Sequence, residues 1–243
     1  MTENNATGNG ADVSYFFESL LLDLNAWAEQ IGRIFESRDE APGPRELDAA
    51  FHPLVDQFLD RETHPLVGAG FVAARDALAG APWHMAWWQG EAKERLLRLT
   101  MESAGETYSR REWFTVPMDT GEGHIAGPYV DFLCTDEYTL TFTVPVTAKG
   151  NIVGVAGADV LVETIELLLV DRLRDIDRRA ALVNVNGRVV VSADPQLAAG
   201  KLLVRGWQDS RDSTLPVAGG DLGFDKVLLS RCGTLPLAIA VPA

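Results

Sequence analysis

The sequence has little of what metal sites, disulfide frameworks and nucleic-acid-binding surfaces require. Its 243 residues include only two cysteines, Cys134 and Cys232, which lie far apart and have no C-x-x-C partner. We therefore expect neither a zinc site nor a disulfide framework. Its 21 basic residues are outnumbered by 35 acidic ones, which gives a net charge of −14. Because nucleic acids and anionic membranes attract basic surfaces, we predict no nucleic-acid partner and no membrane partner.

Long apolar runs are also absent. No stretch approaches the roughly 18 consecutive apolar residues that a membrane-spanning helix needs. The opening MTENNATGNG holds no Lys or Arg and no apolar core, so it does not read as a signal peptide. These features predict a cytoplasmic location. Hydrophobic residues make up 47% of the chain and charged residues 23%, which is typical of a globular protein with one large domain or two small lobes.

Motifs for catalysis are missing as well. The four histidines are scattered, with no H-x-x-x-H and no G-x-S-x-G pattern, and Ser103 and Ser192 lack an ordered His and Asp arrangement. The turn Gly68-x-Gly70-x-x-Ala73 mimics a dinucleotide-binding fingerprint, but Pro65 stands where its preceding strand should be. We therefore expect a strand over residues 67–74, no enzymatic activity, no cofactor and no metal.

The stretch from Gly105 to Glu166 contains the clearest strand patterns. Residues 138–146 alternate apolar and threonine side chains with a period of two, which predicts a strand with one buried face. A turn signal at residues 147–151 precedes the apolar run 152–158, so the two segments form a hairpin. Residues 127–131 lead into a third strand, and the period of two puts Tyr129 and Asp131 on the same face.

The rest of the chain is predicted from helical periodicity and turn signals. Residues 1–11 are polar and are expected to be disordered, and a long amphipathic helix begins at Asp12 and runs to about Arg38. A second helix is expected over residues 46–60 and a linking helix over residues 160–179. A hairpin turns at Asn186-Gly187, and two more strands follow after a polar stretch at 206–224. The expected divisions are 1–11, 12–62, 63–165 and 166–243, the last a reduced lobe of about four strands.

Six residues in the central stretch carry the chemistry of a small zwitterion site: Arg111, Trp113, Phe114, Tyr129, Asp131 and Asp159. A guanidinium can clamp a carboxylate through two hydrogen bonds. Carboxylates can hold an ammonium group, and aromatic faces can enclose a cation. Each residue also has an ordinary structural interpretation. Arg111 can be one more exposed base beside Arg110, and Asp159 can be the N-cap of a helix that starts at residue 160.

These residues also carry a family resemblance. The segments R-x-W-F, G-P-Y-x-D, Y-T-L-T-F-T-V-P-V and I-V-G-V-A-G-A-D-V resemble the double Cache ligand-sensing domains of bacterial receptors, over about Gly68 to Arg205. The resemblance implies an α+β fold, with a long N-terminal helix and two PAS-like antiparallel lobes. It further implies that Arg111 and Trp113 take a ligand carboxylate. The resemblance also implies that the ammonium group of the ligand is held by three residues, Tyr129, Asp131 and Asp159.

Two positions depart from that family pattern. Phe114 stands where the family prefers Tyr, so one hydroxyl is missing, and Tyr108 lies closer to Arg111 than the family spacing suggests, so it receives no role. In the family the first helix pairs with its twin in a homodimer. Here Phe16 and Leu22 widen the apolar face of the first helix, so this helix can pair in the same way or pack only on its own sheet.

The resulting hypothesis is a sensor that binds an α-amino acid and signals through an unidentified partner. One alternative is a sensor for an amine without a carboxylate. The other is a degenerate Cache-like interaction module that binds no ligand.

Overall fold

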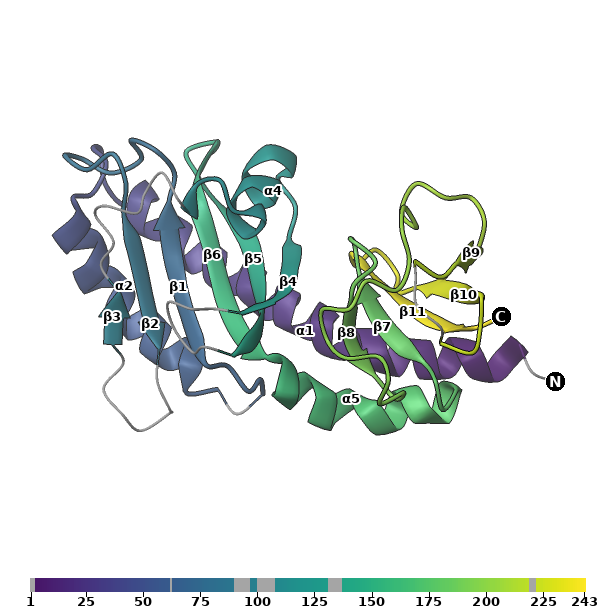
Figure 1. The fold of residues 1–243 in the computed structure, drawn as a ribbon. Helices are drawn as coiled ribbons and strands as arrows, with labels where there is room; N and C mark the ends of the chain where they lie inside the picture. Colours follow the sequence, from purple (N-terminus) through teal and green to yellow (C-terminus); the bar gives the residue numbers. More distant parts are fainter. Residues whose placement is uncertain (1–2, 62, 90–96, 100–107, 131–136, 219–221) are drawn as a thin grey trace. The chain divides into compact units, whose positions relative to one another are not determined.

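The computed structural model describes residues 3–61, 63–89, 97–99, 108–130, 137–218 and 222–243. Within these residues the chain forms two antiparallel sheets together with helices, one of which is much longer than the others (Figure 1). The α+β class and the double Cache-like architecture expected from the sequence are confirmed.

Two helices begin the chain. Helix α1 spans Glu3–Glu36 and helix α2 spans Pro44–Leu59. Helix α1 begins at Glu3 and not at the predicted Asp12, and residues 1–2 lie outside the described residues. The apolar residues of α1 at three- and four-residue spacing are buried, among them Val13, Phe17, Leu20, Leu24, Trp27 and Ile31.

The first sheet has six strands in the described residues, in the order β3-β2-β1-β6-β5-β4. Their bounds are β1 Gly68–Ala73, β2 Met85–Gln89, β3 Leu97–Leu99, β4 His124–Val130, β5 Tyr138–Ala148 and β6 Asn151–Leu161. The predicted hairpin is thus present as β5 and β6. Strand β6 continues beyond its predicted end to Leu161, and Leu161 is the N-cap of the next helix. The interpretation of Asp159 as a helix N-cap is therefore wrong.

One face of this sheet packs against helices α1 and α2 and forms the hydrophobic core with them. Helices α1 and α2 lie behind the sheet in the view of Figure 1. The ring of Phe71 on β1 lies 5.8 Å from that of Phe35 on α1, and the ring of Trp88 on β2 lies 5.3 Å from that of Phe51 on α2. Gly32 lets α1 approach β5 closely, because a Cβ there would lie 2.5 Å from the carbonyl oxygen of Thr147.

The second sheet follows helix α5, Val162–Ile176, and has the order β8-β7-β11-β10-β9. Its strands are β7 Ala181–Asn184, β8 Val189–Ser192, β9 Thr214–Pro216, β10 Lys226–Arg231 and β11 Leu237–Pro242. Strand β9 falls in the polar stretch for which no strand was predicted, so this lobe has five described strands where about four were expected. A strand of three residues is too short to show the alternation of apolar and polar side chains from which strands are predicted.

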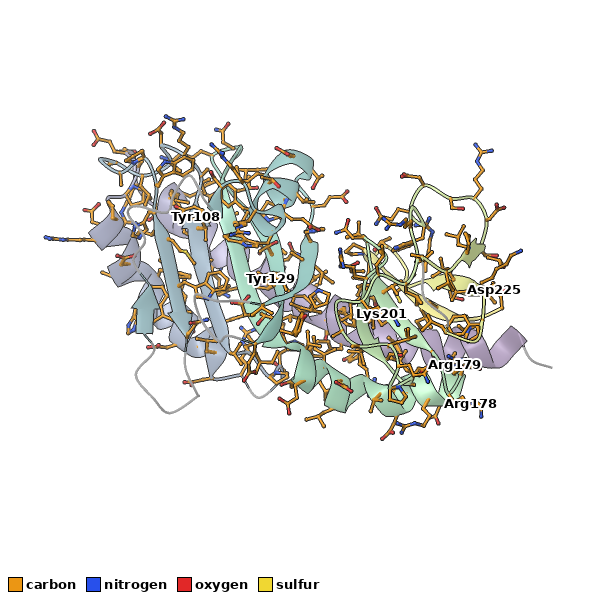
Figure 2. All side chains as sticks on the ribbon, viewed as in Figure 1. Tyr108, Tyr129, Arg178, Arg179, Lys201 and Asp225 are labelled. Carbon is orange, nitrogen blue, oxygen red and sulfur yellow. The ribbon has the colours of Figure 1, made fainter. Side chains whose placement is uncertain are left out.

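Polar contacts organise the core of this second lobe. The indole nitrogen of Trp207 donates to the carbonyl oxygen of Asn184 at 2.7 Å. The guanidinium of Arg179, labelled in Figure 2, donates from Nε to Asp194 at 2.7 Å. Burial alone would raise the pKa of Asp194, but the amide of Gln196 and the Arg179 guanidinium hold that pKa below its ordinary value. Asp194 is therefore a charged anchor within this lobe.

The chain divides into two compact units that are interleaved along the sequence. One contains residues 1–19, 127–140 and 161–243, and the other contains residues 20–126 and 141–160. The expected boundaries at residues 62 and 165 stay a prediction, because the compact units do not follow single breaks in the chain.

The buried face of α1 leads to a matched pair of substitutions. Leu24 is fully buried whereas Leu22, two residues earlier, is 71% exposed. We expect Leu24→Ala to lower the free energy of unfolding by about 2–5 kcal/mol because it leaves a cavity. Leu22→Ala should change it by less than about 0.5 kcal/mol. Urea unfolding at low protein concentration measures both, and equal losses would contradict the described orientation of α1.

Candidate functional site

The face of the first sheet opposite α1 and α2 is built from aligned rows of residues. Residues directly opposite each other on neighbouring strands point to the same face, and the pairing of β1 with β2 and β6 aligns three such rows. From one end of the strands to the other, the rows are Met85–Val72–Val155, Trp87–Gly70–Gly157 and Gln89–Gly68–Asp159. The face therefore changes from apolar to polar along the strands.

The apolar end of this face is covered by aromatic side chains that come from outside the sheet. Helix α4 spans Glu112–Thr120 and follows directly after Tyr108 and Arg111. Tyr108 and Phe114 are buried in one cluster with Trp87 of β2, and Trp113 packs against this cluster. The rings of Tyr108 and Trp113 are stacked with centroids 6.3 Å apart. Tyr108, Trp113 and Phe114 together form an aromatic wall over the apolar end of the face; Tyr108 is labelled in Figure 2.

Glycines in the middle rows allow the indole of Trp87 to lie flat across β1. A Cβ built on Gly70 would lie 2.5 Å from Cε3 of Trp87, and one on Gly157 of β6 would lie 3.2 Å from its Cη2. A Cβ on Gly68 would lie 3.0 Å from the indole nitrogen. Any larger side chain at Gly70 would displace the ring, so these glycines shape the floor of the site.

A buried carboxylate stands at the polar end of the face. Asp159 is only 4% exposed, and the hydroxyl of Thr141 on β5 donates to its Oδ1 at 2.6 Å. Removing a carboxylate from water is costly unless hydrogen bonds or a cation compensate for the lost hydration. The sequence analysis placed Asp159 at the end of a strand, whereas the structure places it within β6 on the face that the aromatic wall adjoins.

The remaining predicted site residues have different surroundings. Arg111 is the N-cap residue of α4, and its carbonyl oxygen accepts from the amides of Phe114 and Thr115 at 2.9 Å. Its side chain is exposed and makes no ion pair with any residue that the structure describes. Tyr129 is half-buried on β4 and belongs to the other compact unit. Asp131 lies outside the described residues.

The start of α4 is anchored by an acidic and a basic side chain. Glu112, the residue after Arg111, lies with its Oε1 2.8 Å from Nε2 of His124 on β4. The His124 side chain is 8% exposed and that of Glu112 is 43% exposed. This contact ties the first turn of α4, with Trp113 and Phe114, to the sheet. Among the described residues, no three His, Cys, Asp or Glu side chains gather as a metal site would require.

Tyr108 is a site residue that the sequence analysis did not assign. Burial raises its pKa to about 12, and the backbone of His84 opposes part of that rise. The buried hydroxyl makes no hydrogen bond of ordinary geometry to any described residue. Tyr108 received no role because it lies closer to Arg111 than the spacing in the double Cache family suggests. Its position in the aromatic cluster nevertheless makes it part of the aromatic wall. The run of aromatic residues from Tyr108 to Phe114 was the signal that could have indicated this.

Three further polar atoms on this face are buried without a partner among the described residues. They are Nε1 of Trp87, Nε2 of Gln89 and Oγ1 of Thr143. Thr143 shares the face, because a Cβ on Gly157 would lie 2.9 Å from its Cγ2. Buried polar groups in native proteins almost always have a partner from the protein, water or a ligand. This face is therefore a candidate binding site.

Comparisons with known proteins agree with this architecture. Residues 82–166 match the family model described as methyl-accepting chemotaxis protein-like, first PDC sensor domain. This segment includes β2, α4, β4, β5 and β6. No curated protein matches the sequence at a significant level. The matched model describes a sensor domain and not an enzyme.

Solved structures with the same fold cover almost the whole chain. The amino acid chemoreceptor PctC of Pseudomonas aeruginosa PAO1, in complex with GABA, gives a TM-score of 0.60 at 17% identity and covers 98% of this chain and 95% of its own. The ligand-binding domain of the Pseudomonas fluorescens chemoreceptor CtaA, in complex with L-leucine, gives 0.61 at 16% identity, with 97% and 90% covered. At these identities the likeness shows a shared fold, and the resemblance to double Cache domains is confirmed.

The expected cytoplasmic location finds no support in these comparisons. The extracellular domain of mmHK1S-Z3 gives a TM-score of 0.67 at 16% identity, with 99% of this chain and 94% of that one covered. No helix in the described residues is long and apolar enough to cross a membrane.

The burial of Tyr108 predicts a dependence of stability on alkaline pH. The phenol ionises near pH 10.0 in the unfolded chain and near 12 in the folded protein. Between these values the folded state keeps a proton that the unfolded state has lost, so stability falls as the pH rises. We expect the free energy of unfolding of Tyr108→Phe to fall less steeply from pH 9 to 11 than that of the wild type. Parallel slopes in denaturant titrations would contradict the burial of this hydroxyl.

Proposed function

We propose that this double Cache sensor domain binds a small ligand with an ammonium group, most simply an α-amino acid, on the open face of its first sheet. The buried carboxylate of Asp159 is the observation on which this proposal mainly rests. An acid buried beside aromatic rings is a favourable environment for a cation, because the carboxylate supplies charge and the ring faces supply cation–π attraction.

The ammonium end of the ligand would lie at Asp159. Thr141 orients this carboxylate through its 2.6 Å hydrogen bond. Across β1 the flat indole of Trp87 lies over Gly68, which is directly opposite Asp159. Tyr129 and Asp131 remain further candidates for the ammonium, as the family resemblance implies.

The carboxylate end of the ligand would be held by Arg111 and Trp113, with Phe114 shaping the same end. Trp113 and Phe114 support this role through their packing on the aromatic wall. Arg111 supports it through its position at the N-terminus of α4, where backbone amides and the helix dipole favour an anion. Because its side chain is exposed, we propose that the guanidinium closes over the ligand on binding.

Two structural neighbours were solved with ligands of the proposed kind. GABA in the PctC complex and L-leucine in the CtaA complex each carry one ammonium and one carboxylate group. A shared fold with a shared type of ligand supports the proposal for this chain. It does not distinguish one amino acid from another, because the residues that contact a ligand side chain vary within a fold.

An amine without a carboxylate is the second candidate ligand. The contrast between a buried Asp159 and an exposed Arg111 favours it, because only the acid is already enclosed. A module without any ligand is the third candidate. In either case we propose that output passes through another protein or through a second copy of the chain. The exposed Tyr15 and Leu22 on α1 would be available for such a contact.

Two substitutions separate these candidates. Asp159→Asn keeps the shape of the side chain but removes the charge, so we expect it to abolish stabilisation by both amino acids and amines. Arg111→Ala should abolish stabilisation by amino acids and spare their decarboxylated amines. A melting-shift screen provides the measurement, because a site filled at about 100 times its dissociation constant adds roughly 2.7 kcal/mol to stability.

Arg110→Ala is the matched control, since Arg110 is an exposed neighbour of Arg111 with the same charge. It should leave every ligand shift unchanged. If Asp159→Asn still binds amino acids as tightly as the wild type, the proposed ammonium site is wrong. If no amino acid or amine stabilises the wild type, the interaction module without a ligand becomes the better explanation.

A further inference from the structure

We propose that the same sheet face carries a polar subsite for the side chain of the ligand, formed by the indole N–H of Trp87 and the amide of Gln89. This subsite would select a ligand side chain with an uncharged acceptor oxygen, such as the carbonyl of a carboxamide. The inference deepens the proposed function and rests on it, because Asp159 must first hold the ammonium group.

The two nitrogen-bearing side chains converge above Gly68. A Cβ on Gly68 would lie 3.0 Å from Nε1 of Trp87 and 2.9 Å from Cγ of Gln89. Both side chains therefore occupy the space that a side chain at position 68 would fill. Gly68 is also directly opposite Asp159 in the pairing of β1 with β6, and side chains at such positions begin about 5 Å apart. The subsite and the proposed ammonium site are thus neighbours across one strand.

Both nitrogens lack a partner in the part of the chain that the structure describes. Nε1 of Trp87 and Nε2 of Gln89 are buried, and no described group accepts from either. An indole N–H and an amide nitrogen are donors only. Buried donors of this kind almost always have an acceptor. A ligand that presents an oxygen with a free lone pair in the subsite would supply that acceptor.

Core packing alone does not account for this arrangement. A buried tryptophan normally directs its N–H to a partner, as Trp207 does toward the carbonyl oxygen of Asn184 at 2.7 Å. Trp87 is just as buried, at 3% exposed, but its ring lies flat over glycines and directs its nitrogen toward the polar end of the face. The ring thus supplies an apolar floor and a hydrogen-bond donor to the same site.

The charge of the surroundings decides which acceptor fits. The three paired rows of this face contain no Lys or Arg, and their only charged member is Asp159. A second carboxylate placed across one strand from Asp159 would be repelled by the negative charge of Asp159. An uncharged oxygen meets the two neutral donors without that penalty. The subsite should therefore prefer a carboxamide over a carboxylate and over a purely apolar side chain.

Three amino acids of similar length test this preference: L-glutamine, L-glutamate and L-methionine. Titration calorimetry with the wild type should give the tightest binding for glutamine. Trp87→Phe keeps an aromatic ring but removes the N–H, and we expect it to weaken glutamine binding by about 3- to 30-fold more than it weakens methionine binding. Gln89→Met, at a half-buried position, should have the same selective effect if Trp87→Phe folds poorly.

The outcomes distinguish the subsite from the proposed function. Equal losses for glutamine and methionine in both variants would overturn the subsite and leave the amino-acid site standing. Glutamate or methionine binding the wild type as tightly as glutamine would do the same. If none of the three amino acids binds the wild type, the subsite is overturned, and the melting-shift screen over the other amino acids and amines decides the proposed function separately.

Discussion

The burial of one carboxylate is the constraint on which the site depends. Asp159 lies within a strand of the first sheet at 4% exposure, and Thr141 on the neighbouring strand donates to it. A charged group in this position lowers the stability of the fold unless donors or a cation compensate for lost water. In the proposed function a ligand ammonium would supply that compensation, so binding and local stability would be linked through the same group.

The two faces of the first sheet divide structure from binding. One face carries Phe71 and Trp88 into an apolar core with α1 and α2. On the other face Gly68 and Gly70 remove side chains from the central strand, so that the indole of Trp87 lies across it. Successive side chains of a strand point to opposite faces of the sheet, so core residues and candidate site residues can alternate along the same strand. Among the described residues, the aromatic wall covers the apolar end of this face.

Sequence reasoning found the candidate residues that stand in local motifs and did not find those that only strand pairing brings together. The R-x-W-F segment pointed to Trp113 and Phe114, which pack in the aromatic wall. Trp87 and Gln89 were not assigned to the site. Their proximity to Asp159 depends on strand register between segments about 70 residues apart in sequence, and no local spacing encodes that register.

The sequence by itself determined most of the elements, because hydrophobic period and turn chemistry are local. The β5–β6 hairpin, the amphipathic α1 and the Asn186-Gly187 turn all form over the residues whose patterns predict them, although α1 and β6 extend beyond the predicted bounds. It also carried the family resemblance. Only the tertiary structure decided that Asp159 is buried within a strand and that Arg111 is exposed at a helix N-cap. Burial is a property of what packs around a residue, and those neighbours come from distant parts of the chain.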